Sequence, residues 1–181
     1  MEARRILFGE DSLQITMSRL AQQLIEDYGD FTGTVLMGLQ PRGILFARRI
    51  QKRLHALTQR DIPLGALDIT FYRDDFRRRD APLSANATDI SFIIEGKRVI
   101  LIDDVLYTGR TVRSALDAMA AYGRPKEVSL LVLIDRKYSR HLPIEPQYIG
   151  RRVNTLDSQR IQVEWSEQGH DKDAIWLIEK N

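Results

Sequence analysis

The sequence predicts an α/β fold with a mainly parallel central sheet flanked by helices, and three observations lead to this prediction. Continuous apolar runs, typical of strands buried on both faces, occur at residues 34–39, 99–102 and 128–134. Amphipathic helical patterns lie between these runs, so that strands and helices alternate along the chain. Polar clusters follow the runs directly, at the strand ends where open α/β sheets bind their ligands.

Three segments have the apolar spacing of helices that bury one face. They span residues 11–28, residues from 44 onward after a turn at 40–43, and residues 109–122, with Gly123 as the stop of the third. The side chains expected to face the core are Leu13, Met17, Leu20, Ala21, Leu24, Ile25 and Tyr28, then Ile44, Leu45, Ala47, Ile50, Leu54 and Leu57, and finally Val112, Ala115, Leu116 and Met119. In the second helix Arg48, Arg49, Lys52 and Arg53 are expected to point outward.

A further strand is expected at about residues 66–71, after which the composition changes sharply. Residues 73–89 are charged at first and then small and polar, with almost nothing to bury. We expect a flexible loop there, because a structureless segment of this length is usually functional or disordered. Its three arginines, Arg77 to Arg79, fit a solvated run better than a catalytic role.

The last third of the chain continues the sheet and then changes pattern. Residues 148–150 can add a short strand, and alternating apolar residues at 161–165 and 174–178 predict a C-terminal β-hairpin, in which Trp165 and Trp176 pack. We find no internal repeat, linker or low-complexity region. The sequence therefore predicts one domain spanning residues 1–181.

Composition disfavours several classes of protein. The formal net charge of +2 does not itself favour a nucleic-acid partner, and the three histidines lack metal-ligand spacing. The chain has no cysteine, which removes disulfides and thiolate metal sites and fits a reducing compartment. No apolar run approaches the roughly 20 residues of a membrane span, and the first residues lack a signal peptide's apolar segment. We expect a cytoplasmic protein without a membrane partner.

Two adjacent carboxylates, Asp103 and Asp104, end the central strand, and a turn rich in hydroxyls and glycine follows at residues 108–111. Such a turn can hold a phosphate, because the first N–H groups of the next helix have no intrahelical partner. The carboxylates would repel a phosphate, but they suit hydroxyls or a divalent cation beside it. Helix capping or a solvated strand end explains the pair less well. The combination indicates a sugar phosphate as ligand.

Polar clusters also follow the other strands, at residues 40–43, 72–75 and 135–136. The Pro-Arg-Gly turn presents backbone N–H groups and the Arg42 guanidinium to an anion, although Arg42 could instead cap the next helix. For Arg73, Asp74 and Asp75 an ordinary charged loop is a serious alternative. We expect these clusters to converge with the Asp103–Asp104 pair on one site.

Residues 99–111, Val-Ile-Leu-Ile-Asp-Asp-Val-Leu-Tyr-Thr-Gly-Arg-Thr, resemble the motif with which type I phosphoribosyltransferases bind phosphoribosyl diphosphate (PRPP). The whole chain further resembles the bifunctional pyrimidine operon attenuator/uracil phosphoribosyltransferase family (PyrR). The matching strings are Asp68-Ile-Thr-Phe-Tyr-Arg-Asp-Asp75, Asp103-Asp-Val-Leu-Tyr-Thr-Gly-Arg-Thr-Val-Arg113, Gly123-Arg-Pro125, Leu142-Pro-Ile and Tyr148-Ile-Gly150. The resemblance implies the type I phosphoribosyltransferase fold, with a flexible loop at 73–89 and a base-binding hood at about 135–160 plus the C-terminal hairpin.

The resemblance implies conversion of uracil and PRPP to UMP and pyrophosphate, with Mg²⁺ bound together with PRPP. The implied catalytic residues are Arg42, Arg73, Asp103 and Asp104, of which the two aspartates would also hold the metal indirectly. The implied PRPP- or nucleotide-binding residues are Pro41, Arg42, Gly43, Asp103, Asp104, Val105, Leu106, Tyr107, Thr108, Gly109, Arg110 and Thr111, and the base would lie against Asp135 and Arg136. The loop from Arg73 would close over PRPP and exclude water.

Two details of this site stay open in the sequence. Members of this family type often have a cis peptide before the arginine of the first turn, and here either the Gln40–Pro41 or the Pro41–Arg42 bond could be the cis one. Some relatives carry an acidic general base before the Thr-Gly pair, where this chain has Tyr107. We therefore expect no carboxylate base at that position.

The resemblance also implies a second role, binding of pyrimidine-operon leader mRNA in response to UMP or UTP, on a face of a homodimer or higher homo-oligomer. The implied RNA-binding residues are Ser18, Arg19, Gln22, Arg140, Arg151 and Arg152. Ser18 and Gln22 replace a Thr and a His of Bacillus-type relatives, a change that can remove base contacts and leave phosphate affinity. Two alternatives remain: an RNA-binding attenuator that uses the site only as a nucleotide sensor, and a phosphoribosyltransferase for another nucleobase.

Overall fold

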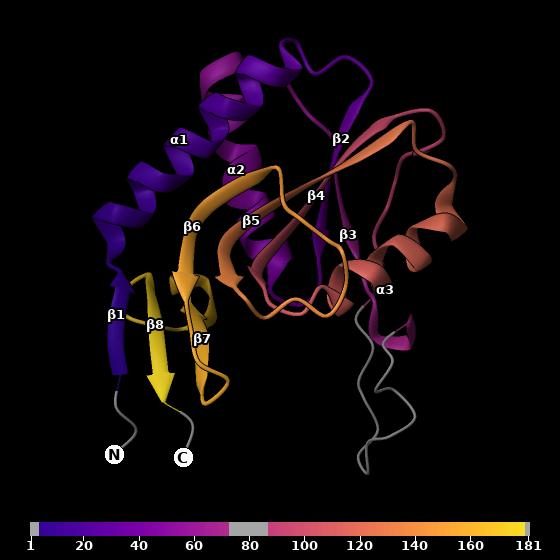
Figure 1. The fold of residues 1–181 in the computed structure, drawn as a ribbon. Helices are drawn as coiled ribbons and strands as arrows, with labels where there is room; N and C mark the ends of the chain where they lie inside the picture. The colour runs from indigo at the N-terminus through magenta and orange to yellow at the C-terminus, as the bar shows by residue number, and fades with distance from the viewer. Residues whose placement is uncertain (1–3, 73–86, 180–181) are drawn as a thin grey trace.

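A five-stranded parallel sheet lies at the centre of the molecule, in the order β3-β2-β4-β5-β6 (Figure 1). The structure is a computed structural model that describes residues 4–72 and 87–179. The strands are β2 (Thr34–Leu39), β3 (Leu64–Leu67), β4 (Arg98–Leu106), β5 (Glu127–Lys137) and β6 (Tyr148–Asn154). β2 is buried along its whole length. The parallel sheet expected from the apolar runs is confirmed.

Helices cover both faces of this sheet, because alternate side chains of each strand point to opposite sides. On one face Leu36, Ile100 and Leu131 pack with α1 (Glu10–Tyr28) and α2 (Gly43–Thr58). On the other face Met37 and Leu101 belong to the cluster that packs against α3 (Arg110–Met119). None of the helices in the described part of the chain is long and apolar enough to cross a membrane.

A second, antiparallel sheet joins the two ends of the described chain, in the order β1-β8-β7 (Figure 1). The predicted C-terminal hairpin is confirmed as β7 (Gln159–Glu164) and β8 (Ala174–Glu179). We did not predict β1 (Arg4–Phe8), in which only Phe8 is buried. Its sequence has no alternation of apolar and polar residues that would predict a strand. It is a strand because it pairs with β8, which is distant in the chain.

The strand predicted at 66–71 is wrong in its bounds, since β3 ends at Leu67 and the chain forms a short 3₁₀ helix, η1 (Thr70–Tyr72). The Asp68 carboxylate accepts hydrogen bonds from the Thr70 N–H (3.0 Å) and hydroxyl (2.7 Å). An aspartate that binds the backbone two residues ahead makes a turn in place of a sheet ladder. Two helix positions expected inside, Leu57 and Leu116, are also exposed, at 54% and 42%.

The flexible loop expected at 73–89 is shorter at its C-terminal end. Asp89 pairs with Ala66 of β3 through two backbone hydrogen bonds (2.8 and 2.9 Å), and the Thr88 hydroxyl accepts the N–H of Asp68 (3.1 Å). The Gln40 side chain donates to the Ala87 carbonyl (2.7 Å). The rest of that loop, with Arg73 and the other charged residues, lies outside the described residues.

β5 and β6 are both longer than predicted. β5 reaches Lys137, so that Asp135 and Arg136 lie within the strand and not after it. Parallel pairing of residues 131–137 with residues 148–154 extends both strands together. The polar residues of β5 therefore sit at the C-terminal end of the sheet, on a rigid element.

Candidate active site

Three of the four predicted polar clusters meet at the C-terminal edge of the parallel sheet. The turn after β2 contacts the end of β4, and the turn after β4 contacts the end of β5 and the loop that follows it. Of the fourth cluster, Tyr72 lies in η1, next to α3, and residues 73–75 lie outside the described part. The convergence that parallel topology predicts is confirmed for these three clusters.

Asp103 and Asp104 lie side by side near the end of β4 and are only 6% and 5% exposed. The Asp103 Oδ1 accepts the backbone N–H of Asp104 (2.9 Å), and the Asp104 Oδ1 accepts that of Val105 (2.7 Å). Burial raises the pKa of the Asp103 carboxyl well above its ordinary value, and the adjacent Asp104 carboxyl raises it further. Burial also raises the pKa of Asp104, although Arg42 opposes this. The pair is therefore poised for a ligand that brings positive charge or hydroxyl donors.

The turn at residues 40–43 is pressed against this pair. The Gln40–Pro41 peptide is cis, which decides the choice that the sequence left open. Gly43 begins α2, and a β-carbon there would lie 2.6 Å from the Ile102 carbonyl oxygen and 2.9 Å from the Asp103 α-carbon. Only glycine allows this approach. It brings the unpaired N–H groups at the start of α2 next to Asp103.

Arg42 stands at the N-cap position of α2, but its side chain makes no capping hydrogen bond. The alternative that Arg42 serves as a helix cap is therefore not supported. Its guanidinium is exposed and close enough to oppose the rise in the pKa of Asp104. A guanidinium beside free helical N–H groups is suited to an anion.

The turn after β4 is shaped by Gly109, whose φ of 89° lies in the left-handed region, directly before α3. The Thr108 carbonyl accepts the N–H of His141 (2.9 Å), and a β-carbon at Gly109 would lie 3.3 Å from the Ile144 side chain. This turn is thus covered on one side by the loop after β5. The other side presents the first N–H groups of α3, which suit a phosphate.

Asp135 and Arg136 are both buried, and both hold neighbouring chain segments in place. The Arg136 guanidinium lies 3.8 Å from the centre of the Tyr107 ring and donates to Thr155 Oγ1 (2.7 Å), Leu156 O (3.2 Å) and Gln159 O (3.1 Å). These bonds fasten the segment before β7 over Tyr107. The role of Asp135 and Arg136 in binding a base stays a prediction.

The six residues predicted to bind RNA do not form one surface. Ser18, Arg19 and Gln22 are exposed on α1, and Arg19 donates to the carbonyls of Ile149 (3.2 Å) and Gly150 (2.7 Å) of β6, just before the exposed Arg151. Arg140 and Arg152 instead pair with the two oxygens of the Asp135 carboxylate. Arg19 thus joins α1 to β6, whereas the Arg151 guanidinium donates to the Leu7 carbonyl of β1 (2.9 Å). Their role in RNA binding stays a prediction.

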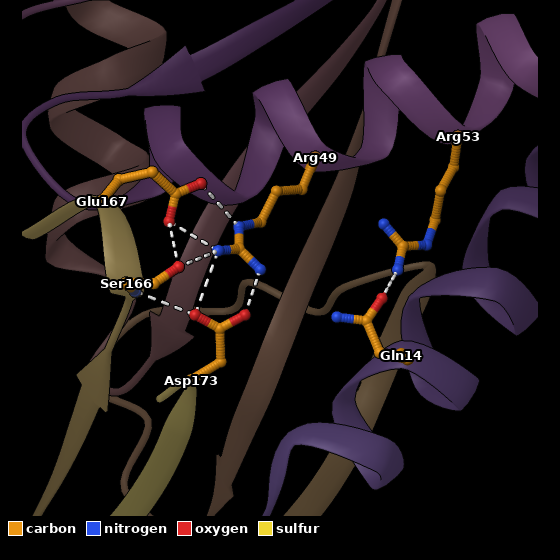
Figure 2. A network of polar contacts seen from close by, with 6 residues as sticks. All are labelled: Gln14, Arg49, Arg53, Ser166, Glu167 and Asp173. Atoms are coloured by element: carbon orange, nitrogen blue, oxygen red, sulfur yellow. Dashed lines mark hydrogen bonds and ion pairs between the residues drawn. The ribbon is translucent and has the colours of Figure 1, made fainter. Parts of the chain in front are cut away.

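Sequence reasoning missed a polar network that ties α2 to the second sheet (Figure 2). Arg49, expected to point outward, forms a two-bond ion pair with Asp173 and also donates to Glu167 (2.5 and 3.0 Å) and Ser166 (3.3 Å). Its guanidinium lies 4.4 Å from the centre of the Trp165 ring. Asp173 is 5% exposed and is 124 residues from Arg49 in the chain, so no local pattern could connect them.

Comparisons with known proteins show what this chain is similar to. The family model described as the phosphoribosyl transferase domain matches residues 10–168. The chain is 38% identical over 184 residues to the bifunctional protein PyrR of Listeria monocytogenes serotype 4a, covering 100% of both. It is 44% identical over 163 residues to that of Limosilactobacillus fermentum, covering 88% of this chain and 90% of the relative.

Solved structures show the same fold. The hypoxanthine phosphoribosyltransferase of Trypanosoma cruzi matches with a TM-score of 0.71 at 16% identity, covering 98% of this chain and 97% of that one. A hypoxanthine phosphoribosyltransferase of Staphylococcus aureus matches with a TM-score of 0.69 at 21% identity. It covers 94% of this chain and 90% of its own. The expected type I phosphoribosyltransferase fold is confirmed.

Proposed function

We infer that this chain, which belongs to the bifunctional PyrR family of phosphoribosyltransferase-domain proteins, transfers the phosphoribosyl group of PRPP to uracil. The products are UMP and pyrophosphate. One observation carries this function beyond family membership: the buried Asp103–Asp104 pair lies between two turns suited to anions, at residues 40–43 and 108–111. A sugar with a phosphate at one end and a diphosphate at the other fits that order.

In this reading each of the three parts binds one part of PRPP. The first N–H groups of α3, after Gly109, receive the 5′-phosphate. Asp103 and Asp104 accept hydrogen bonds from the ribose hydroxyls. Arg42 and the start of α2 face the diphosphate. We propose that Arg73 and its loop cover the substrate; they lie outside the residues that the structure describes.

The Asp103–Asp104 pair also fits Mg²⁺ that arrives with PRPP. Burial raises the pKa of both carboxyls, so a cation beside them would favour their charged forms. Among the described residues no group of three or more metal-ligating side chains could hold an ion alone. Substrate oxygens would have to complete the coordination. When bound, Mg²⁺ supplies positive charge next to the departing diphosphate.

The reaction breaks the bond between C1′ of the ribose and a diphosphate oxygen, and forms the bond between C1′ and N1 of uracil. Positive charge develops on the ribose as the diphosphate leaves, so the protein contributes mainly by placing the base and neutralising the leaving group. Arg42 serves the second task. Tyr107 supplies no carboxylate base, so we propose that N1 loses its proton late, to water or a backbone oxygen.

We propose a second function, binding of a pyrimidine-gene leader RNA in response to UMP or UTP, because the relatives of this chain are bifunctional PyrR proteins. The residues that support it are Ser18, Arg19 and Gln22 on α1 and Arg151 on β6, all of them exposed. We propose that it acts in a cytoplasmic homodimer or higher homo-oligomer. The cysteine-free composition supports that compartment.

A panel of nucleobases tests the enzyme. With PRPP and Mg²⁺ we expect formation of UMP from uracil and little product from hypoxanthine or guanine. Turnover with a purine instead would identify a phosphoribosyltransferase for another base. Tight UMP binding without turnover of any base would identify a nucleotide sensor.

A gel-shift assay with the leader RNA of pyrimidine genes tests the second function. We expect a shift that UMP strengthens and that survives a change from low to physiological salt. A shift by any RNA, lost as salt rises, would reflect phosphate contacts alone and would contradict specific regulation.

A further inference from the structure

A cavity of about 370 Å³ lies between the turn at residues 40–43 and the second sheet. Its polar lining consists of Arg42, Arg160, Gln162, Gln168 and His170. None of the described residues that line it is acidic. Two guanidinium groups, an imidazole and two amides around one space are suited to an anion of several charges.

The cavity begins at the residue that faces the Asp103–Asp104 pair. Arg42 lines it, and the next residue, Gly43, is in contact with Asp103. The turn suited to the 5′-phosphate instead contacts the loop at residues 141–144. The cavity therefore lies on the side of the Asp103–Asp104 pair where the turn at residues 40–43 stands. The 5′-phosphate would bind at the other turn, at residues 108–111.

The two walls of the cavity are fastened to each other. Arg42 precedes α2, and Arg49, about two helical turns further along, binds Asp173, Glu167 and Ser166 at the connection between β7 and β8 (Figure 2). Gln168 and His170 lie within that connection. The network thus holds them at a set place relative to Arg42, without substrate.

Glu164, a carboxylate close enough to His170 to feel its charge, is already hydrogen-bonded. Glu164 accepts hydrogen bonds from Trp176 Nε1 (2.8 Å), Arg4 (2.6 Å) and Gln162 Nε2 (2.9 Å). Burial alone would raise the pKa of Glu164, but the hydrogen bonds from Trp176 and Arg4, together with nearby His170, lower it. Because the Gln162 amide is used in this way, Gln168 and His170 are the better donors from this wall.

We propose that this cavity receives the diphosphate end of PRPP and the released pyrophosphate, with His170 and Gln168 as binding residues opposite Arg42. The proposal rests on the proposed function and adds to it a wall of the site supplied by the β7–β8 connection. The group that the cavity would bind is a diphosphate. PRPP and pyrophosphate contain this group, but so does a nucleoside triphosphate, and the experiment distinguishes between these ligands.

Isothermal calorimetry with pyrophosphate, PRPP, UMP and UTP, each with and without Mg²⁺, tests the proposal without turnover. The variants are His170→Ala, Gln168→Ala, the double variant and His170→Gln. His55→Ala is the matched control, because His55 is a half-exposed histidine near the other end of α2. Gln168 and His170 are exposed, and thermal unfolding checks that each variant folds like the parent.

We expect the double variant to bind pyrophosphate and PRPP about tenfold more weakly, since each lost donor costs on the order of one net hydrogen bond. His170→Gln keeps a donor and should recover part of this loss. UMP and UTP should bind the double variant as they bind the parent, and His55→Ala should change nothing. In turnover, the PRPP KM should rise more than kcat falls.

An unchanged pyrophosphate affinity in the double variant would overturn the proposal, whether or not the parent makes UMP. An equal loss for UTP and pyrophosphate, with PRPP unaffected, would also overturn it and assign the cavity to a triphosphate tail. If pyrophosphate binding weakens as expected but the parent transfers to no base, the cavity assignment stands and the proposed function fails.

Discussion

Gly43 at the start of α2 and Asp103 near the end of β4 approach so closely that a β-carbon on Gly43 would lie 2.9 Å from the Asp103 α-carbon. This contact joins the turn that we propose to bind the diphosphate to the carboxylates that we propose to bind the ribose. A methyl group at Gly43 would push the start of α2 away from β4, because the two nearest atoms, the Ile102 carbonyl oxygen and the Asp103 α-carbon, belong to the backbone and cannot rotate away.

We therefore predict that Gly43→Ala destabilises the protein by about 1–3 kcal/mol, the usual range for an overpacked site, and raises the PRPP KM. Chemical denaturation and steady-state kinetics measure the two effects. Gly9→Ala is the matched control, since Gly9 also lies at the start of a helix, as the N-cap of α1, and a β-carbon there would have only one side-chain atom within 4 Å, at 3.9 Å. Equal effects of the two substitutions would contradict the close-approach account.

The raised pKa of Asp103 predicts a pH dependence of stability in the ligand-free protein. Burial and Asp104 disfavour the charged carboxylate in the folded state, so its contribution to stability is fully present below the ordinary pKa of 3.8 and is lost as the pH rises through the raised pKa. Asp103→Asn removes this loss. We predict that the variant has the higher melting temperature at pH 8 and that the difference shrinks toward pH 4.

For a chain of this size, each kcal/mol that Asp103→Asn adds to the free energy of unfolding should raise the melting temperature by about 2–4 °C. The same variant should bind PRPP more weakly, because it cannot supply the charge that the ligand needs. A melting temperature that is lower in Asp103→Asn at every pH would show that the carboxylate stabilises the free protein.

The pKa of Asp173 is shifted in the opposite direction from that of Asp103, so its effect on stability has the opposite dependence on pH. Burial alone would raise its pKa, but hydrogen bonds from Arg49 and from the Ser166 N–H lower it overall. Its contribution to stability is therefore present above pH 3.8 and is lost as the pH falls through the lowered pKa. We predict that Asp173→Asn lowers the melting temperature at neutral pH and that the difference from the parent narrows in acid.

Arg49→Ala should destabilise the protein by about 2–4 kcal/mol, because it leaves the buried Asp173 carboxylate without its partner. Arg53→Ala is the comparison, since Arg53 lies one turn further along α2 and donates to the Gln14 side-chain oxygen, which carries no charge (Figure 2). Its effect should be clearly smaller in denaturant titrations. Similar losses for both arginines would mean that general packing of α2, and not the Asp173 pair, explains the effect.

Tyr107 offers a test of how the base loses its proton. The Tyr107 hydroxyl lies 3.4 Å from an Asp157 oxygen, and the Arg136 guanidinium contacts the ring, which a phenylalanine would keep. We predict that Tyr107→Phe changes kcat by less than about fivefold, well below the factor of about 100 or more that removal of a general base costs. A thousandfold fall in kcat would make Tyr107 part of the proton transfer.

The parts of the fold that follow local rules could be predicted from the sequence. The strand at 34–39 lies where expected, and the apolar run before Asp103 forms a strand as expected. That strand does not end at the Asp103–Asp104 pair, because its pairing with β5 continues to Leu106. β1 and the Arg49–Asp173 pair could not be predicted, because each depends on a partner more than a hundred residues away. The ion pair of Arg140 with Asp135 could not be predicted either, because the sequence shows the charge of Arg140 but not its partner; its role in RNA binding stays a prediction.

The most direct test of the central claim is the affinity of Asp103→Asn/Asp104→Asn for PRPP in the presence of Mg²⁺, measured by calorimetry. If the buried pair holds the ribose of PRPP, the double variant should bind PRPP at least about 100-fold more weakly than the parent, since two charge-assisted contacts are lost. An unchanged PRPP affinity would contradict the account.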